Sequence, residues 1–191
     1  MKKIVSAAVL GASMLLALPV SALEVAGTQI VEKVVVAESP LLLNGAGIRK
    51  KMVFDVYIAS LYVIAKTSDA AQVLNSTSPR RMQMNMLRTV DSKSLHEALL
   101  EGLQQNVSAA QLKGFAGKLA ELEKIFAEMK SANKGDVIVL DFIPNQGTKI
   151  SMRGQAVGVI EGDAFATALL SIWLGKAPVN EALKAALLGK V

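Results

Sequence analysis

A long apolar pattern dominated by β-branched and aromatic residues runs from Met52 to Ala65. Residues of this composition favour extended backbone, so the pattern predicts a long β-strand. Side chains alternate between the two faces of a strand, and here both faces are mostly apolar, which is typical of a strand that is covered on both sides. Asn44-Gly45 and Gly47 precede this strand and predict a tight turn, because glycine adopts positive φ without steric cost. We expect the fold to be organised around this turn and strand.

Shorter alternating patterns on both sides of this segment predict further strands. Residues 28–37 are rich in β-branched side chains, and Pro40 separates them from residues 41–44, so we expect two strands there. Residues 81–87 alternate polar side chains with three methionines, which predicts a strand with one polar and one apolar face. The methionines are expected to pack in the core, with an adaptable pocket as the alternative. A meander of three strands is predicted over residues 137–143, 148–154 and 155–161.

Two serine-containing motifs indicate helices in the middle of the chain. Ser94 and Ser108 are each followed, three residues later, by a glutamate or glutamine, which is the spacing of a capping box. We therefore expect one helix over residues 94–106 and a second over residues 109–130. The second has apolar residues at helical spacing, so one stripe of it should face the core.

The remaining helical segments complete the prediction of the fold class. Residues 164–174 are apolar almost all round, which predicts a buried helix capped by Asp163 and too short to span a membrane. Residues 68–74 and 178–188 predict two further helices, the first of them capped at Ser68. No internal repeat or linker interrupts the pattern. Together the elements predict an α+β fold, a mostly antiparallel sheet with a layer of helices.

The N-terminus has the pattern of a secretory signal. Two lysines precede an uncharged apolar run that ends in Val20-Ser21-Ala22, a small-residue cleavage site. We expect residues 1–22 to be a cleaved signal peptide, with an uncleaved membrane anchor as the alternative. Residues 23–191 then form one domain with a substantial core, without a membrane span and with a periplasmic location.

Composition excludes several kinds of site. The chain contains no cysteine, which rules out disulfides, thiolate metal sites and thiol nucleophiles. A zinc site or a serine hydrolase would need the single histidine, His96, whose place in the first turn of a predicted helix favours an exposed residue. We therefore expect no metal, no cofactor and no catalytic residue.

The charge of the chain is mildly basic. The formal net charge is +5, and removing Lys2 and Lys3 with the signal leaves 5 − 2 = +3. The remaining basic residues are scattered among acidic ones, without a basic stripe or interleaved aromatic residues, so nucleic acid is not an expected partner.

The segments GAGIRKK, residues 45–51, and VYIASLYV, residues 56–63, resemble the signature of the chalcone isomerase-like family. The resemblance extends more loosely from about Glu24 to the C-terminus. The family includes plant chalcone isomerases, plastid fatty-acid-binding proteins and many bacterial proteins. The resemblance implies an open-faced β-sandwich, in which helices pack on one side of an antiparallel sheet and a ligand cleft lies between the two layers.

The same resemblance implies two ligand-binding residues. Arg49 matches the arginine that holds one side of the substrate in the isomerases and, together with a tyrosine, the carboxylate in the fatty-acid binders. Tyr57 is matched with that tyrosine, although the isomerases place a threonine there. A guanidinium fork and a phenol can donate to one carboxylate, so the pair is chemically consistent with this role. The structural alternatives are an ion pair between Arg49 and Asp55, and plain core packing of Tyr57.

The sequence departs from the isomerases at three other positions. Those enzymes use a tyrosine and an asparagine seven residues apart on one helix and a polar residue on a late helix, whereas the matching residues here are Leu95, Gly102 and Ile172. Because these side chains offer no donors, we expect a non-catalytic binder of a small apolar carboxylate such as a fatty acid. The alternatives are an intramolecular lyase-type isomerase acting on an enone or phenol, and a structural or partner-binding domain. Nothing in the pattern indicates an oligomeric state.

Overall fold

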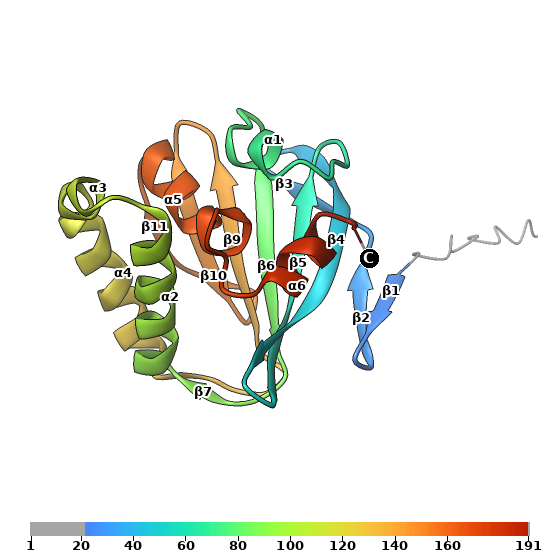
Figure 1. The fold of residues 1–191 in the computed structure, drawn as a ribbon. Coiled ribbons are helices and arrows are strands. Elements are labelled where there is room, and N and C mark those ends of the chain that lie inside the picture. The colour runs from blue at the N-terminus through green and yellow to red at the C-terminus, as the bar shows by residue number, and fades with distance from the viewer. Residues whose placement is uncertain (1–21, 191) are drawn as a thin grey trace, which may run out of the picture.

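An antiparallel sheet of seven strands forms the centre of the computed structural model, which describes residues 22–190 (Figure 1). The predicted signal segment lies outside these residues except for Ala22. The strand order across the sheet is β11-β10-β9-β6-β5-β4-β3. The strands are β3 Lys33–Val36, β4 Ser39–Lys51, β5 Phe54–Val63, β6 Arg80–Met86, β9 Val137–Ile143, β10 Gly147–Met152 and β11 Gln155–Ile160.

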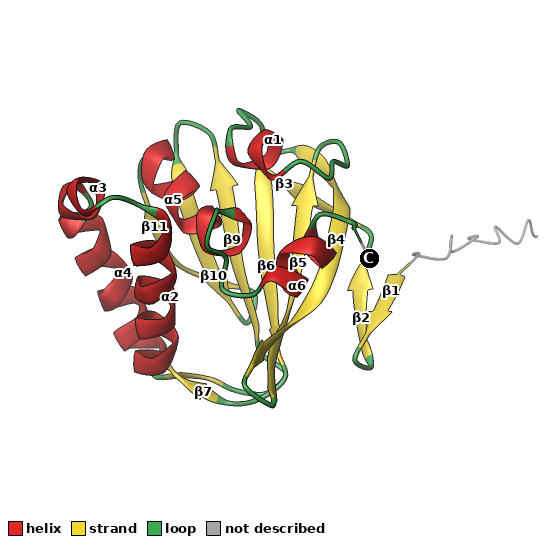
Figure 2. Ribbon diagram, viewed as in Figure 1, coloured by secondary structure: helices red, strands yellow, loops and turns green. Residues whose placement is uncertain are grey.

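The helices gather on one face of this sheet (Figure 2). They are α1 Ala70–Leu74, α2 Ser92–Asn106, α3 Ala109–Gly114, α4 Ala116–Met129, α5 Asp163–Leu174 and α6 Glu181–Leu187. Two small pairs of strands complete the fold, β1 Ala22–Val25 with β2 Thr28–Val31, and β7 Val90–Asp91 with β8 Ser131–Ala132. This arrangement confirms the predicted α+β class and the open-faced sandwich. Within residues 22–190, no helix is long and apolar enough to cross a membrane.

The two faces of β5 serve two separate cores, as its alternation predicts. One face packs against the helices in the main core, together with the three methionines of β6, which are all buried. The opposite face contributes Ile58 and Tyr62 to a smaller cluster beneath Ile30 of β2. The Tyr62 hydroxyl donates to the carbonyl of Val31 at 3.0 Å, which ties β2 to the sheet. The β1–β2 hairpin therefore covers part of the face that carries no helix.

The turn predicted at Asn44-Gly45 is wrong, because β4 runs through it. The ladder pairs Leu43 with Tyr62 and Gly45 with Leu61, so Asn44 is the extra residue of a β-bulge. The chain turns later, at Met52 and Val53, and β5 begins at Phe54 rather than at Met52. The strand predicted over residues 28–37 is likewise two strands, since β2 and β3 belong to different sheets.

Gly45 and Gly47 serve the packing of α6 rather than a turn. A Cβ atom at Gly45 would lie 2.1 Å from the carbonyl oxygen of Ala186, and one at Gly47 would lie 2.7 Å from the Cβ of the same residue. Real Cβ atoms do not approach other atoms so closely, so only glycine lets this helix lie directly on β4. Neither glycine has a positive φ.

Asn44 holds the end of α6 and the loop after β5 against the sheet. Its Nδ2 atom donates to the carbonyl oxygens of Leu187 at 2.7 Å and of Thr67 at 3.0 Å. Its Oδ1 atom accepts from the backbone N–H of Thr67 at 2.8 Å. A bulge places this side chain between the two segments, because the extra residue has no partner across the ladder.

Two of the predicted helix starts differ in the structure. The capping box of Ser108 and Gln111 is confirmed. Helix α2, however, is capped by Asp91, whose carboxylate accepts from both the N–H and the hydroxyl of Ser94, so Ser94 is a donor and not the cap. Helix α1 is capped by Asp69 rather than Ser68. In both cases a nearby carboxylate, which is a stronger acceptor than a hydroxyl, takes the capping position.

Three further helical predictions need correction. The helix predicted over residues 109–130 is two helices, which meet at Phe115. Asp163 does not cap α5, because its carboxylate accepts from the backbone N–H of Asn145 at 2.9 Å. The helix predicted from residue 178 begins only at Glu181, after an N-cap at Asn180.

Candidate functional site

A cavity of about 580 Å³ lies between the sheet and the helices. Strands β4, β5 and β6 form one wall, and α2, α4 and α5 form the other. Its inner lining is mostly apolar, and its mouth lies at the β4–β5 turn, where Met52 and Phe54 are both exposed and both line it. The inner residues are Arg49, Val56, Tyr57, Met84, Leu95, Leu99, Gly102, Phe126, Ile172 and Val179.

A second β-bulge brings the two predicted ligand-binding residues to this cavity. Arg49 of β4 is opposite Tyr57 of β5, and the next pair is Lys50 with Asp55, so Val56 is the extra residue. A bulge changes the direction of the side chains beside it. As a result Val56 and Tyr57 both line the cavity, and Tyr57 faces it from the position opposite Arg49. The structure therefore places Arg49 and Tyr57 together, as the sequence resemblance implies.

The hydroxyl of Tyr57 is oriented by Trp173. The indole Nε1–H of Trp173 donates to the phenol oxygen at 3.0 Å, and the two residues are 1% and 7% exposed. Burial raises the pKa of the Tyr57 hydroxyl, and the hydrogen bond from Trp173 and the charge of Arg49 oppose this rise. The phenol is therefore protonated at neutral pH. Because its oxygen already accepts from Trp173, its own proton is available to a ligand.

Sequence reasoning missed Trp173. It is the one tryptophan of the chain, on a helix that is apolar almost all round. A buried indole N–H usually finds an acceptor. That rule signals a polar partner for Trp173, but it does not indicate which residue supplies the acceptor.

Arg49 keeps its charge available at the cavity. Its Nη1 donates to the carbonyl oxygen of Lys50, while Asp55, the partner considered from the sequence, pairs instead with the ammonium of Lys50 at 3.2 Å. Among the residues that the structure describes, no carboxylate lies within ion-pair distance of Arg49. Arg49 as a residue is half-buried, and a guanidinium without a counter-charge beside an apolar space favours an anionic ligand.

The arginines at the start of β6 differ from Arg49 in this respect. Arg80 is buried, and its Nη1 donates to the carbonyl oxygens of Val73 and Leu74 at the end of α1. Arg81 forms a bidentate pair with Asp141, at 2.6 and 2.8 Å, on the opposite face of the sheet. Both have protein partners, so neither is a candidate for the ligand.

The three positions that depart from the isomerases meet in the cavity wall. Leu95, Gly102 and Ile172 all line it. A Cβ atom at Gly102 would lie 2.8 Å from the Cγ2 of Ile172, so the isoleucine occupies the space that a larger side chain on α2 would need. These residues present hydrocarbon to the cavity, where the isomerases present hydrogen-bond donors.

His96 lies outside this cavity. It is half-buried rather than exposed as predicted, with its ring 6.0 Å from the ring of Phe126, measured between centroids. In the part of the chain that the structure describes, no cluster of three histidine, cysteine, aspartate or glutamate residues could hold a metal.

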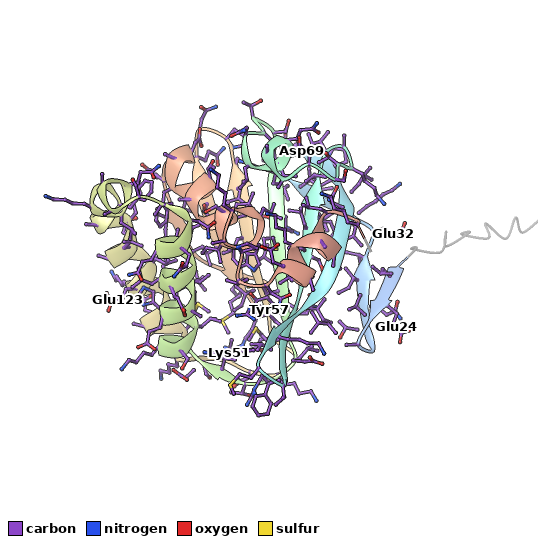
Figure 3. The ribbon with its side chains drawn as sticks, in the orientation of Figure 1. Glu24, Glu32, Lys51, Tyr57, Asp69 and Glu123 are labelled. Atoms are coloured by element: carbon purple, nitrogen blue, oxygen red, sulfur yellow. The ribbon has the colours of Figure 1, made fainter. Side chains whose placement is uncertain are left out.

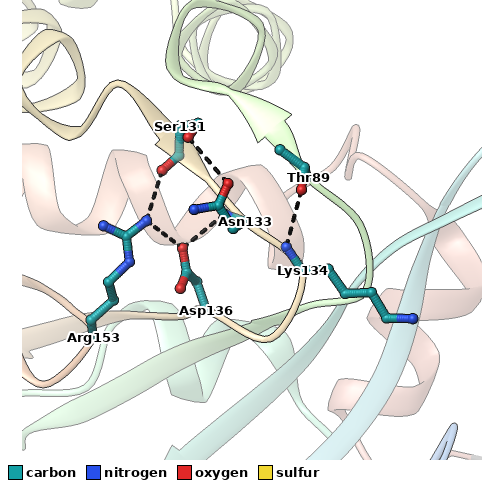
Figure 4. A network of polar contacts seen from close by, with 6 residues as sticks. All are labelled: Thr89, Ser131, Asn133, Lys134, Asp136 and Arg153. Carbon is teal, nitrogen blue, oxygen red and sulfur yellow. Dashed lines mark hydrogen bonds and ion pairs between the residues drawn. The ribbon is translucent and has the colours of Figure 1, made fainter.

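A polar network holds the loops beside the mouth (Figure 4). Arg153 donates to Asp136 at 2.6 Å and to the carbonyl oxygen of Ser131 at 3.1 Å. The hydroxyl of Thr89, which lines the cavity, accepts from the backbone N–H of Lys134 at 3.3 Å. The network therefore joins the loop after β6 to the loop before β9.

Comparison with known proteins gives a family match and similar solved structures. A family model described as chalcone isomerase-like matches residues 22–189. Among solved structures, a fatty-acid binding protein of Arabidopsis thaliana matches with a TM-score of 0.63 and 16% sequence identity, over 85% of this chain and 92% of that chain. At this identity the likeness shows a shared fold. No curated protein matches the chain.

Proposed function

Because the chain belongs to the chalcone isomerase-like family, we propose that it is a non-catalytic binding protein for a small apolar carboxylate, such as a fatty acid. One observation carries this proposal. The unpaired guanidinium of Arg49 and the free proton of the Tyr57 hydroxyl meet at one side of a cavity whose other walls are mostly apolar.

The two groups complement a carboxylate. A guanidinium offers a fork of parallel N–H donors, and the phenol adds a third donor that Trp173 already orients. Carboxylates accept from several donors at once, so both Arg49 and Tyr57 can bind the same head group.

The remaining walls complement an alkyl tail. Leu99, Phe126 and Ile172 line the space away from the head group, and 580 Å³ is within the range of small-molecule sites. Each buried methylene contributes about 0.8 kcal/mol, so ten methylenes give roughly 8 kcal/mol before the ordering cost of the chain is subtracted. The similar fold of a protein named for fatty-acid binding supports the same ligand class.

The isomerase alternative lacks a supporting observation. Leu95, Gly102 and Ile172 supply no donor, and close contact between the last two leaves no room for one. Positioned acid–base groups account for much of the rate of such reactions. Arg49 and Tyr57 can hold a head group, but these three positions add no donor that would orient a reacting substrate.

Isothermal titration of delipidated protein with a medium-chain fatty acid, and with the alcohol of the same length, tests the proposed function. The acid is expected to bind at least tenfold more tightly, because the alcohol has no anion for Arg49. Equal affinity for the two ligands, or binding of neither, would contradict the proposal.

We also propose that the domain acts in the periplasm after cleavage of residues 1–22. The charged start, apolar run and small-residue end of this segment support export. N-terminal sequencing of the exported protein should give Leu23 as the first residue. Recovery of intact Met1 in membranes that have been washed with salt would instead indicate an uncleaved anchor.

A further inference from the structure

The tip of the β4–β5 hairpin exposes three consecutive apolar side chains. Met52 is 89% exposed, Val53 is 84% exposed and Phe54 is 53% exposed. We call these three residues the apolar tip. It lies at the lower end of the molecule in Figure 1 and projects away from the helices. Val35 and Val159, which are 66% and 53% exposed, are single side chains on the two edge strands of the seven-stranded sheet.

Local turn chemistry does not explain the apolar tip. The turn has two residues, and Met52 adopts φ = +54°, whereas Val53 does not have a positive φ. Turns with this pattern favour glycine at the first position and a small polar residue at the second. A methionine and a valine here oppose both the backbone preference and the usual polarity of a turn, which indicates that the side chains themselves serve a purpose.

Basic residues lie beside the apolar tip, and the cavity that opens here is also lined by two acids, Asp91 and Glu101. Residues 50–55 contain Lys50 and Lys51 against one acid, Asp55, a net charge of 2 − 1 = +1. Asp55 pairs with Lys50. Lys51 has no ion-pair partner among residues 22–190, so its charge faces solvent uncompensated. The guanidinium of Arg88 lies 4.5 Å from the ring centroid of Phe54 and adds a further positive charge.

This pattern complements the surface of an anionic bilayer. Apolar side chains enter the boundary between head groups and acyl chains, while flanking lysines and arginines meet the anionic head groups. Each such cation near an anionic surface contributes attraction that salt weakens.

The apolar tip is also the rim of the cavity. Lys51, Met52, Phe54 and Arg88 all line the mouth. Figure 3 labels Lys51 at this end of the molecule and Tyr57 farther in, along the same hairpin. A tip inserted into a bilayer therefore directs the mouth toward the lipid, and an apolar ligand can pass between bilayer and cavity without crossing water.

We propose that the apolar tip docks the protein onto an anionic lipid bilayer, with the cavity mouth facing the membrane. The ligand-transfer part of this inference rests on the proposed function, whereas the docking itself rests only on the tip and its cations. The two are therefore tested by separate measurements.

Flotation of the exported protein with vesicles tests the docking. Vesicles of equal parts phosphatidylglycerol and phosphatidylcholine should bind the wild type at low salt, and binding should fall as sodium chloride rises. Val53→Asp should reduce the partition coefficient at least tenfold. Val35→Asp is the matched control, since it places the same charge at an exposed valine on β3, and it should bind as the wild type does.

A second variant separates docking from folding. Met52→Gly with Val53→Ser gives the turn the residues that its backbone prefers, so it should fold at least as stably as the wild type while losing vesicle binding at least tenfold. Fatty-acid titration without vesicles should give the wild-type affinity for Val53→Asp, because Val53 does not line the cavity.

The vesicle and fatty-acid measurements together test membrane docking and the proposed function separately. The docking proposal is overturned if the wild type does not bind anionic vesicles at low salt, which is the result expected if the apolar tip binds a protein instead. It is also overturned if Val53→Asp and Val35→Asp bind the vesicles equally well. Vesicle binding without fatty-acid binding would support docking and contradict the proposed function. Fatty-acid binding without vesicle binding would support the proposed function and contradict docking.

Discussion

Arg49→Ala should weaken the binding of a medium-chain fatty acid by at least tenfold, since it removes the guanidinium while the apolar walls stay in place. A charge-assisted pair in a partly buried site is worth about 2 to 5 kcal/mol when one partner is truncated. Arg49→Lys should restore only part of the affinity, because an ammonium cannot reproduce the fork of the guanidinium. Tyr57→Phe, which removes one neutral donor, should cost about 1 kcal/mol.

Lys50→Ala is the matched control for this series. It also removes one positive charge from β4, but Lys50 is exposed, pairs with Asp55 and does not line the cavity. Its fatty-acid affinity, measured by isothermal titration, should stay within about twofold of the wild type. If Lys50→Ala weakens binding as much as Arg49→Ala, the effect is one of general charge and the carboxylate site is not at Arg49.

Gly45→Ala should destabilise the fold strongly, because its added methyl group meets backbone on α6. The new Cβ would lie 2.1 Å from the carbonyl oxygen of Ala186 and 2.8 Å from that of Leu187. Neither oxygen can rotate away, so the helix must shift off β4. Overpacking of this kind costs about 1 to 3 kcal/mol, which corresponds to a fall in Tm of roughly 2 to 12 °C for a chain of this size.

Gly117→Ala controls for the glycine-to-alanine change itself. Gly117 lies in α4, and a Cβ there meets nothing within 4 Å. Alanine favours helix over glycine by about 1 kcal/mol, so this variant should melt at or above the wild-type temperature. Thermal unfolding followed by circular dichroism compares the two variants. A Gly45→Ala protein as stable as the Gly117→Ala protein would show that α6 does not rest on β4 as described.

Features set by local pattern could be predicted from the sequence. The two apolar faces of β5, the meander of β9 to β11 and the capping box at Ser108 each depend on residues within one or two elements. The pairing of Arg49 with Tyr57 came from the family resemblance. Its geometry depends on the bulge at Val56, which is visible only once the register is known.

Features that depend on contacts between distant residues could not be predicted from the sequence. Glycine has two uses, so the sequence predicts Gly45 as a turn residue, whereas the α6 residues that it contacts lie more than a hundred positions away. The Trp173–Tyr57 hydrogen bond spans 116 positions. The real turn, at Met52 and Val53, carries no residue that favours a turn. We propose that these side chains are selected for membrane binding instead.

The hydrogen bond from Asn44 to Leu187 has a consequence for the order of folding. The two residues are 143 positions apart, so the strip of β4 that contains Gly45 and Gly47 has no cover until α6 has been synthesised. Contacts between such distant residues form slowly, because the intervening chain must lose entropy before they add stability. We therefore expect the sheet to be completed late in folding, when α6 docks on β4.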